Sequence, residues 1–288
     1  MLFGIALPNI GAAANTNRLA ILDTAHAAES LGFHSVWLSD HVALPEADAG
    51  ANVNLFEVMT TLGYLAASTT RIRLGISSLV LPQRSPVEVA RQLATLDLLS
   101  NGRIQVAVGV GWSEGEYGAM GQNFHNRGKR MEEAVRVLRT LWRGSKVVSF
   151  RGKYYNFPKV VFGPPCVQHG GPKLWIGGDS TVALKRSVLH ADGWHPNARS
   201  AEDLALALAP VLPLLANRPF DIVMRIPLTL QEDSTRVALH GSPQELIDQI
   251  KIYQQAGLTG MVIDCDAESQ AERGRMLERF SQTVLPAF

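Results

Sequence analysis

The chain has 288 residues and a mass of 31.3 kDa, which suits one large α/β domain. Its 27 basic and 26 acidic residues nearly balance, so no general field exists to hold nucleic acid or an anionic membrane. The two cysteines, Cys166 and Cys265, are too few for a disulfide framework, and no apolar run approaches the roughly 20 residues that cross a bilayer. We therefore expect a cytoplasmic protein with neither nucleic-acid nor membrane partners.

Short β-branched apolar runs alternate with longer segments of helical period, which is typical of βα units on a parallel sheet. In the first half of the chain, strands are predicted over 2–7, 35–38, 72–81 and 104–110. The helices predicted between and after them are 16–32, 55–68, 86–100 and 127–144. Segment 145–172 breaks this alternation, because aromatic and β-branched residues surround Gly and Pro there, and it predicts a surface hairpin plus loop.

The alternation resumes after the insertion. Strands are predicted over 173–178, 192–196, 220–230 and 260–264. A helix that starts at Ser180 follows the first of them, and a helix that ends at Leu215 follows the second. Helices over 242–257 and 269–285 follow the last two. Eight strands, each followed by a helix, predict a single (β/α)8 TIM barrel domain over 1–288, with an insertion at 145–172 after the fourth βα unit. An open doubly wound sheet is the alternative.

The glycine-rich stretch "VAVGVGWSEGEYG" (106–118) differs from a dinucleotide-binding fingerprint. Glu114 occupies the place of the third glycine, and the unit is the fourth of eight rather than the first. In a barrel this strand end lies at the mouth where loops surround the substrate. Gly109 and Gly111 are therefore predicted to leave room for a flat ligand, with Glu114 projecting toward it.

Other strand ends carry polar or small residues as well. The second ends in Asp40 and His41, and the third in Ser77 and Ser78. The fifth runs through glycines into a helix whose first turn offers free N–H groups and a hydroxyl, which predicts an anion site. The residues of that predicted anion site are Gly177 and Gly178, with the hydroxyl of Ser180 or Thr181.

Several strings, in order, resemble one known family. They are "AESLGFHSVWLSDH", "LGISSLVLPQRSPVEVARQLATLDLLSNGR", "VGVGWSEGEYGAMG", "RGKRMEEAVRVLRTLW", "GPKLWIGGDSTVAL", "ADGWHP" and "GSPQELIDQIKIYQQAG". This order resembles the bacterial luciferase-like flavin- or deazaflavin-dependent oxidoreductases, a (β/α)8 superfamily, and is most similar to the branch that uses coenzyme F420.

The resemblance implies roles for individual residues. Asp40 is expected to hydrogen-bond the deazaflavin ring, and His41 to face the substrate above the reactive carbon. A strand bulge, often with a non-proline cis peptide, supports one face of the ring and falls near Ser77 and Ser78. Glu114 falls at the position of a proton donor or acceptor. The cofactor phosphate site falls on Gly177, Gly178 and Ser180.

Each of these residues also has a purely structural interpretation. His41 is equally a loop histidine, Asp40 a turn former, and Glu114 a first-turn acid that favours a helix N-terminus. Glu116 is predicted to be a surface residue. Trp112, in the rim loop, is predicted to wall the pocket. Trp175 and Trp194 are either pocket walls or core residues.

One basic cluster, Arg127, Lys129 and Arg130, has two interpretations. It could meet the anionic tail of the deazaflavin coenzyme, or it could be a solvated helix start in which Arg130 pairs with Glu132 or Glu133. We favour the solvated helix start.

The function predicted from the sequence is an F420-dependent oxidoreductase that transfers a hydride between reduced deazaflavin and a small organic substrate. An FMN-dependent monooxygenase is the alternative, and a non-catalytic flavin-binding protein is the alternative from another class. "SDH" offers too few ligands for a metal-dependent hydrolase, so no metal site is predicted. Loop 42–54 and insertion 145–172 are expected to build the substrate pocket, and a homodimer is expected by analogy with the family.

Overall fold

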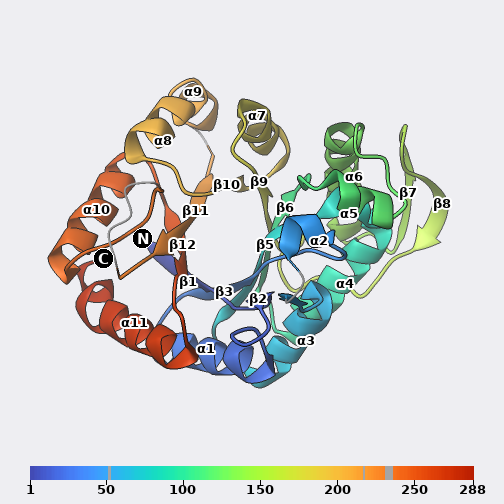
Figure 1. Cartoon of the computed structure of the whole chain (residues 1–288). Helices are drawn as coiled ribbons and strands as arrows, with labels where there is room; N and C mark the ends of the chain where they lie inside the picture. The colour runs from blue at the N-terminus through green and yellow to red at the C-terminus, as the bar shows by residue number, and fades with distance from the viewer. Residues whose placement is uncertain (51–52, 217, 231–235) are drawn as a thin grey trace.

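Eight parallel strands close into a barrel in the computed structural model, which describes residues 1–50, 53–216, 218–230 and 236–288. Around the barrel the strands are β1 (Leu2–Ala6), β12 (Gly260–Cys265), β11 (Asp221–Leu228), β10 (Gly193–His195), β9 (Lys173–Gly177), β6 (Ile104–Gly109), β5 (Arg73–Val80) and β3 (Ser35–Leu38). β1 closes the ring, because it pairs with both β12 and β3 (Figure 1). The predicted (β/α)8 barrel is confirmed, and the open-sheet alternative is wrong.

Helices form the outer layer of the barrel (Figure 1). The longer ones are α1 (Arg18–Ser30), α3 (Val58–Ser68), α4 (Pro86–Leu99), α6 (Arg127–Trp142), α7 (Thr181–His190), α8 (Ala201–Leu208), α10 (Pro243–Gln255) and α11 (Gln270–Thr283). Most start at a Ser or Asn whose side chain accepts a first-turn N–H, the usual N-cap arrangement. No helix in the described part of the chain has both the length and the apolar character to span a membrane.

The helix predicted to end at Leu215 is instead divided. α8 ends at Leu208, and a separate short helix, α9 (Leu212–Leu215), follows. Pro210 and Pro213 lie in this region, and proline lacks the backbone N–H that a continuous helix needs.

The insertion after the fourth unit forms the predicted hairpin. β7 (Val147–Arg151) and β8 (Asn156–Val161) pair antiparallel, and the hairpin lies beyond α6 at the edge of the molecule (Figure 1). Loop 42–54 holds structure that was not predicted. It contains the short helix α2 (Glu46–Ala49) and β4 (Val53–Leu55), which pairs with β2 (Ile10–Ala12), while residues 51–52 lie outside the described part.

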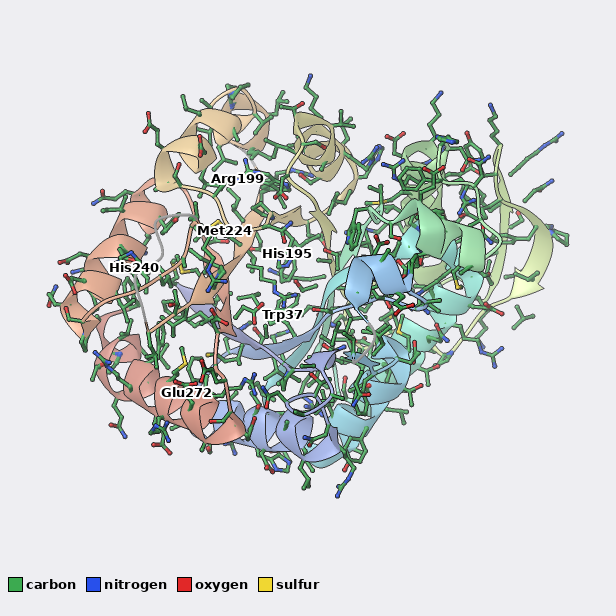
Figure 2. All side chains as sticks on the ribbon, in the orientation of Figure 1. Trp37, His195, Arg199, Met224, His240 and Glu272 are labelled. Carbon is green, nitrogen blue, oxygen red and sulfur yellow. The ribbon has the colours of Figure 1, made fainter. Side chains whose placement is uncertain are left out.

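Large aromatic side chains fill the barrel interior. Trp37 stacks on Trp175 at a ring separation of 5.3 Å, and Figure 2 shows Trp37 and His195 inside the ring of strands. Glycines make this possible, since a Cβ at Gly4 or Gly75 would lie closer than 3.0 Å to the Trp37 ring. With its interior filled, the barrel leaves space for a ligand at its mouth.

Trp175 is thus a core residue. Trp194 is also buried, and its Nε1 donates to the Gly178 carbonyl at 2.8 Å. Neither tryptophan is a pocket wall.

Candidate active site

A pocket of about 450 Å³, here called the cup, opens at the carboxyl ends of the barrel strands. It is lined by Ser39, Asp40, His41, Ser77, Ser78, Val80, Gly109, Val110, Gly111, Trp112, Gly177, Gly178, Asp179, Ser180, Ala183, Arg186, Asn197 and Arg225. Ten of the eleven site residues predicted from the sequence are therefore brought together, and Glu114 is the exception. None of the described residues of 42–54 or 145–172 lines the cup, so their expected part in the substrate pocket stays a prediction.

His41 is held by a buried glutamate. Its Nδ1 lies 3.2 Å from one Glu116 oxygen and 3.3 Å from the other. The Glu116 side chain is 0% exposed, so its prediction as a surface residue is wrong. Glu114 is 66% exposed and lies 3.5 Å from His125, and its predicted projection toward the ligand is wrong.

The rotation of the helix explains why Glu116 is buried and Glu114 is exposed, the reverse of the prediction. Both belong to the short helix α5 (Glu114–Ala119), and residues two apart point to nearly opposite sides of a helix. Ser113 caps α5, and the turn places Glu116 and Tyr117 inside the protein. The burial of Tyr117 next to Glu116 is the signal that could have identified the buried face.

Burial alone would raise the pKa of Glu116. Hydrogen bonds from His41, the Val42 N–H and Gln83 outweigh that effect and hold the pKa at about 2. Glu116 is therefore an anion at neutral pH, and it accepts a hydrogen bond from the protonated Nδ1 of His41. The other ring nitrogen, Nε2, is then free to exchange a proton.

Asp40 lines the cup but is engaged within the protein. Arg84 Nη2 donates to Oδ1 at 2.6 Å, and the Val80 N–H donates to Oδ2 at 2.9 Å. Burial raises the pKa of Asp40, while the Arg84 charge opposes that rise. Asp40 thus fixes the end of β5, and any hydrogen bond to a ligand ring would share an oxygen with one of these donors.

β5 carries the predicted bulge. Its register with β6 shifts between Ile76 and Leu79, and the Ser77–Ser78 peptide bond is cis. Ser77 Oγ lies 2.6 Å from His195 Nε2. Burial, followed by the Arg225 charge, lowers the pKa of His195 to about 4, so this histidine is neutral at pH 7.

Two of the glycines have a different role from the predicted one. A Cβ at Gly109 would lie 3.2 Å from the Ser78 Cβ, and a Cβ at Gly177 would lie closer than 3.0 Å to Ser78 Oγ. Gly109 therefore makes room for the Ser78 side chain rather than for the predicted flat ligand, and Gly177, predicted as part of an anion site, makes room for the same side chain.

The anion-site residues lie where β9 meets α7. Gly178 has a φ of 117°, which favours glycine, and Ser180 Oγ accepts the Ala183 N–H at 3.1 Å as the N-cap. The exposed Trp112 ring lies edge-on to His41, with 5.8 Å between ring centroids. It thus forms part of the cup wall next to the histidine.

Arg225 is a cup residue that the sequence interpretation missed. Its Nη1 donates to Ser39 Oγ at 2.7 Å, and its Nη2 donates to Asp264 Oδ2 at 2.6 Å. Strand alternation contains the signal, because Val223, two residues earlier on β11, packs inside the barrel. Arg225 therefore brings a guanidinium, ion-paired with Asp264, to the cup.

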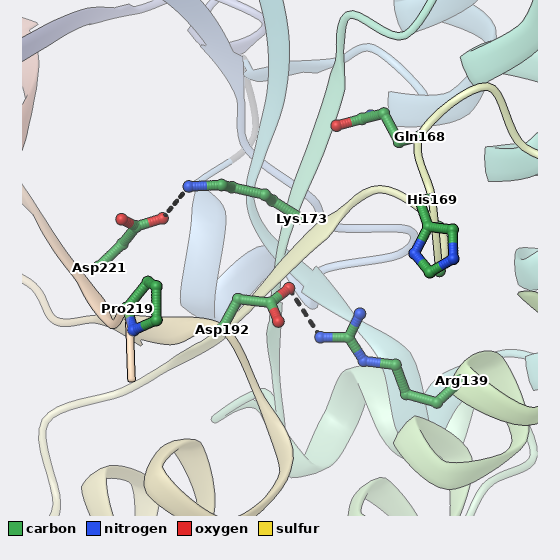
Figure 3. Close-up of a pocket in the computed structure, with 9 residues that line it drawn as sticks. Arg139, Gln168, His169, Lys173, Asp192, Pro219 and Asp221 are labelled. Carbon is green, nitrogen blue, oxygen red and sulfur yellow. Dashed lines mark hydrogen bonds and ion pairs between the residues drawn. The ribbon is translucent and has the colours of Figure 1, made fainter. Parts of the chain in front are cut away.

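A second pocket, of about 570 Å³, lies near the N-terminal ends of β9 and β11. Figure 3 shows that its charges pair with one another, Arg139 with Asp192 at 2.7 Å and Lys173 with Asp221 at 2.6 Å. Ion pairs at the N-terminal face of a barrel serve stability, since chemistry is found at the opposite face. This pocket is therefore a structural feature.

Comparison with known proteins adds sequence relatives. The model of the luciferase-like monooxygenase family matches residues 1–236. An uncharacterized protein of Mycobacterium tuberculosis is 28% identical over 95% of this chain and 97% of its own. The F420-dependent glucose-6-phosphate dehydrogenase of Amycolatopsis mediterranei is 26% identical over 92% of this chain and 93% of its own. The FMNH2-dependent dimethylsulfone monooxygenase of Pseudomonas putida is 32% identical over 52% of this chain and 42% of its own.

Solved structures share the fold. The monooxygenase RslO1 from Streptomyces bottropensis superimposes with a TM-score of 0.84 at 21% identity, covering 99% of both chains. An F420-dependent secondary alcohol dehydrogenase in complex with an F420-acetone adduct has the same TM-score at 19% identity, covering 99% of this chain and 98% of that one. At these identities the likeness concerns the barrel alone.

Proposed function

Because this chain belongs to the luciferase-like monooxygenase family, we propose that it is an oxidoreductase that transfers a hydride between reduced coenzyme F420 and a small organic substrate. The observation that carries the proposal is the cup, where His41, oriented by the buried Glu116 anion, lies beside the predicted cofactor-binding residues.

The cup fits a flat, phosphate-bearing coenzyme. Its volume of about 450 Å³ falls within the ordinary range of small-molecule sites. At one side, Gly178 and Ser180 lead into α7, and a helix N-terminus favours an anion. We assign the coenzyme phosphate to this side, and the ring to the space between Ser78 and His41.

The extent of the sequence matches supports F420 over FMN. The F420-dependent relative aligns with 92% of this chain, whereas the FMNH2-dependent relative aligns with 52% of it. The F420-dependent relative therefore also matches the second half of the barrel, which supplies Gly177, Ser180 and Arg225 to the cup.

In this proposal, bound F420 supplies or accepts the hydride. His41 gives or takes the accompanying proton at Nε2, while Glu116 keeps the proton on Nδ1 and so fixes the orientation of the ring. Arg225 lines the cup, and its guanidinium, oriented by Asp264, offers N–H donors to a bound ring or substrate. The packed side chains of the barrel interior exclude water from the side of the cup that faces the barrel.

Titrating the purified protein separately with F420 and with FMN tests the coenzyme assignment. We expect F420 to bind at least tenfold more tightly than FMN. Tight FMN binding without F420 binding would favour an FMN-dependent monooxygenase instead. F420 binding with no reduction of any member of a panel of small ketones and aldehydes would favour a non-catalytic binding protein.

Replacement of His41 by Ala tests the proton role. Turnover should fall by about tenfold to a hundredfold, the lower part of what general acid-base catalysis contributes, while the F420 dissociation constant stays within about twofold. Equal turnover in the variant would remove His41 from the mechanism.

We also propose that the protein forms a homodimer, by analogy with the family. Leu19 on α1 and Tyr64 on the neighbouring α3 expose apolar surface that such an interface could cover. Light scattering after size exclusion should give about twice the chain mass of 31.3 kDa. The chain mass itself would refute the dimer.

A further inference from the structure

Arg130 on α6 is a buried cation without a carboxylate partner among the described residues. It is 8% exposed, so its prediction as part of a solvated helix start is wrong. Neither predicted partner pairs with it, because Glu132 binds Arg186 and the oxygens of Glu133 accept backbone N–H groups of the hairpin. Its Nε and Nη2 are buried and have no hydrogen-bond partner in the described part of the chain.

Arg130 lines a cavity of about 600 Å³ outside the barrel, here called the side cavity. The side cavity lies between the starts of α4 and α6 and the turn of the β7–β8 hairpin. Its lining residues are Arg84, Ser85, Pro86, Val87, Gln122, Asn126, Arg130, Tyr154, Tyr155, Asn156 and Phe157. Two arginines are thus present, and no described acidic residue lines the cavity.

The two arginines differ in their charge balance. Arg84 is neutralised by Asp40 at 2.6 Å and by Glu57 at 3.6 Å. Arg130 has no carboxylate partner in the described part of the chain. Tyr155 is a hydrogen-bond partner of this guanidinium, but Nε and Nη2 have no acceptor in the described part of the chain. Buried charged donors without acceptors are unfavourable, which favours a partner from outside the chain.

The surrounding backbone favours a negative partner as well. Ser85 is the N-cap of α4, and Pro86 is its first residue. Asn126 precedes the first residue of α6 and makes no side-chain cap bond. Both helices thus direct the positive ends of their dipoles toward the side cavity, and helix N-termini stabilise anions.

We propose that the side cavity is a binding site for a small oxyanion, a phosphate or a carboxylate, with Arg130 as its principal charged contact. The site is separate from the cup, since Arg84 lies between them, lining the side cavity and bonding Asp40 on the cup side. Polar groups of Gln122 and Asn126 supply further hydrogen bonds, and the hairpin tyrosines form the outer wall.

Calorimetric titration of the full chain with inorganic phosphate, without any coenzyme, tests this proposal. Two variants introduce a carboxylate into the side-cavity lining, Val87→Glu and the isosteric Asn156→Asp. Two matched controls add the same charge elsewhere, Leu99→Glu at the exposed far end of α4 and Ser180→Asp in the cup, where Asp preserves an N-cap acceptor.

The wild type should bind phosphate saturably at one site in the side cavity. Val87→Glu and Asn156→Asp should each weaken binding at that site by at least tenfold, and Leu99→Glu should change it by less than about twofold. Ser180→Asp should remove only phosphate binding at the coenzyme-phosphate side of the cup and leave the side-cavity site within about twofold. Asn156→Asp keeps the test valid if Val87→Glu fails to fold. Absence of phosphate binding at the side-cavity site, or its loss in Ser180→Asp or Leu99→Glu alone, would overturn the proposal. Because no coenzyme is used, these outcomes are independent of the proposed oxidoreductase activity.

Discussion

When one ring nitrogen of a histidine is held protonated by a hydrogen bond, proton exchange takes place at the other nitrogen. Glu116 makes such a hydrogen bond with Nδ1 of His41. The same carboxylate accepts the Val42 N–H at 2.7 Å and the Gln83 amide at 3.1 Å. Glu116 thus orients both the ring and the loop that carries it. We assign it as a positioning residue, because its contacts reach the cup through His41.

Exchange of Glu116 for Gln tests that role against a matched change at Glu114. Glu116→Gln should lower kcat by about tenfold, or about 1.4 kcal/mol, because the neutral amide no longer stabilises the protonated Nδ1. Glu114→Gln should leave kcat unchanged, since that side chain is exposed. Steady-state kinetics and coenzyme titration check both variants.

A rise in KM alone for Glu116→Gln, with kcat unchanged, would mean that the residue shapes the binding site and does not orient the proton. An equal loss of kcat in both glutamine variants would attribute the effect to the net charge near α5.

Strand-end position was enough to predict most of the cup from the sequence. Asp40 and His41 follow the end of β3, and Ser77 lies at the bulge in the C-terminal half of the neighbouring β5. Parallel strands bring their carboxyl ends to one face. Glu116 and Arg225 were missed because their positions depend on the rotation of α5 and β11. That rotation is set by packing against distant segments.

At the scale of elements, a buried carboxylate fastens the insertion hairpin to α6. Glu133 accepts the N–H groups of Lys153, Tyr154 and Tyr155 at 3.0, 2.8 and 2.7 Å. Burial opposes the charge, but these three bonds keep the pKa of Glu133 below its usual value. Glu29 holds the turn at residues 70–72 in the same way.

Replacement of Glu133 by Ala should release the hairpin turn. The free energy of unfolding should fall by about 2–4 kcal/mol, since three backbone N–H donors lose a charged acceptor. Amide exchange at residues 153–155 should accelerate, while the barrel strands retain their protection. Arg136→Ala is the control, because Arg136 approaches Glu133 only at 3.7 Å and is exposed. Slow exchange at 153–155 in Glu133→Ala would show that other contacts hold the turn.

The hydrophobic periodicity of the sequence predicted the positions of most helices and strands, and capping residues and prolines determine their exact ends. The predicted helix 86–100 is observed as Pro86–Leu99, with the cap at Ser85 and a proline in the first turn. The β2–β4 ribbon could not be predicted, because its strands have three residues each and pair across more than 40 positions. Such short strands carry no periodic signal.

At the scale of the whole molecule, two tryptophans and the glycines facing them fill the barrel interior. Gly75→Ala should destabilise the protein by about 1–3 kcal/mol, since the new methyl group would overlap the Trp37 ring. Gly63→Ala is a matched change within α3, where a Cβ meets Leu96 at an ordinary 3.7 Å. That variant should gain up to about 1 kcal/mol from helix propensity. Urea unfolding measures both, and equal effects would contradict the packing argument.

The neutral His195 inside the barrel makes the stability of the whole fold depend on pH. Its pKa is about 4 in the folded protein and near the ordinary 6.5 when unfolded, so the unfolded chain takes up a proton first as pH falls. Above pH 6.5, His195 therefore does not lower the free energy of unfolding. As pH falls from 6.5 to 4, the free energy of unfolding decreases by about 3 kcal/mol.

Replacement of His195 by Gln should remove this slope, since glutamine does not titrate. His125→Gln removes an exposed histidine and should leave the slope unchanged. The free energy of unfolding in urea, measured at half-unit steps from pH 4 to pH 8, compares the two variants with the wild type. If the free energy of unfolding of His195→Gln depended on pH as in the wild type between pH 6.5 and 4, other groups would take up the protons. The burial of His195 against the Trp37 ring would then not be the cause of the pH dependence.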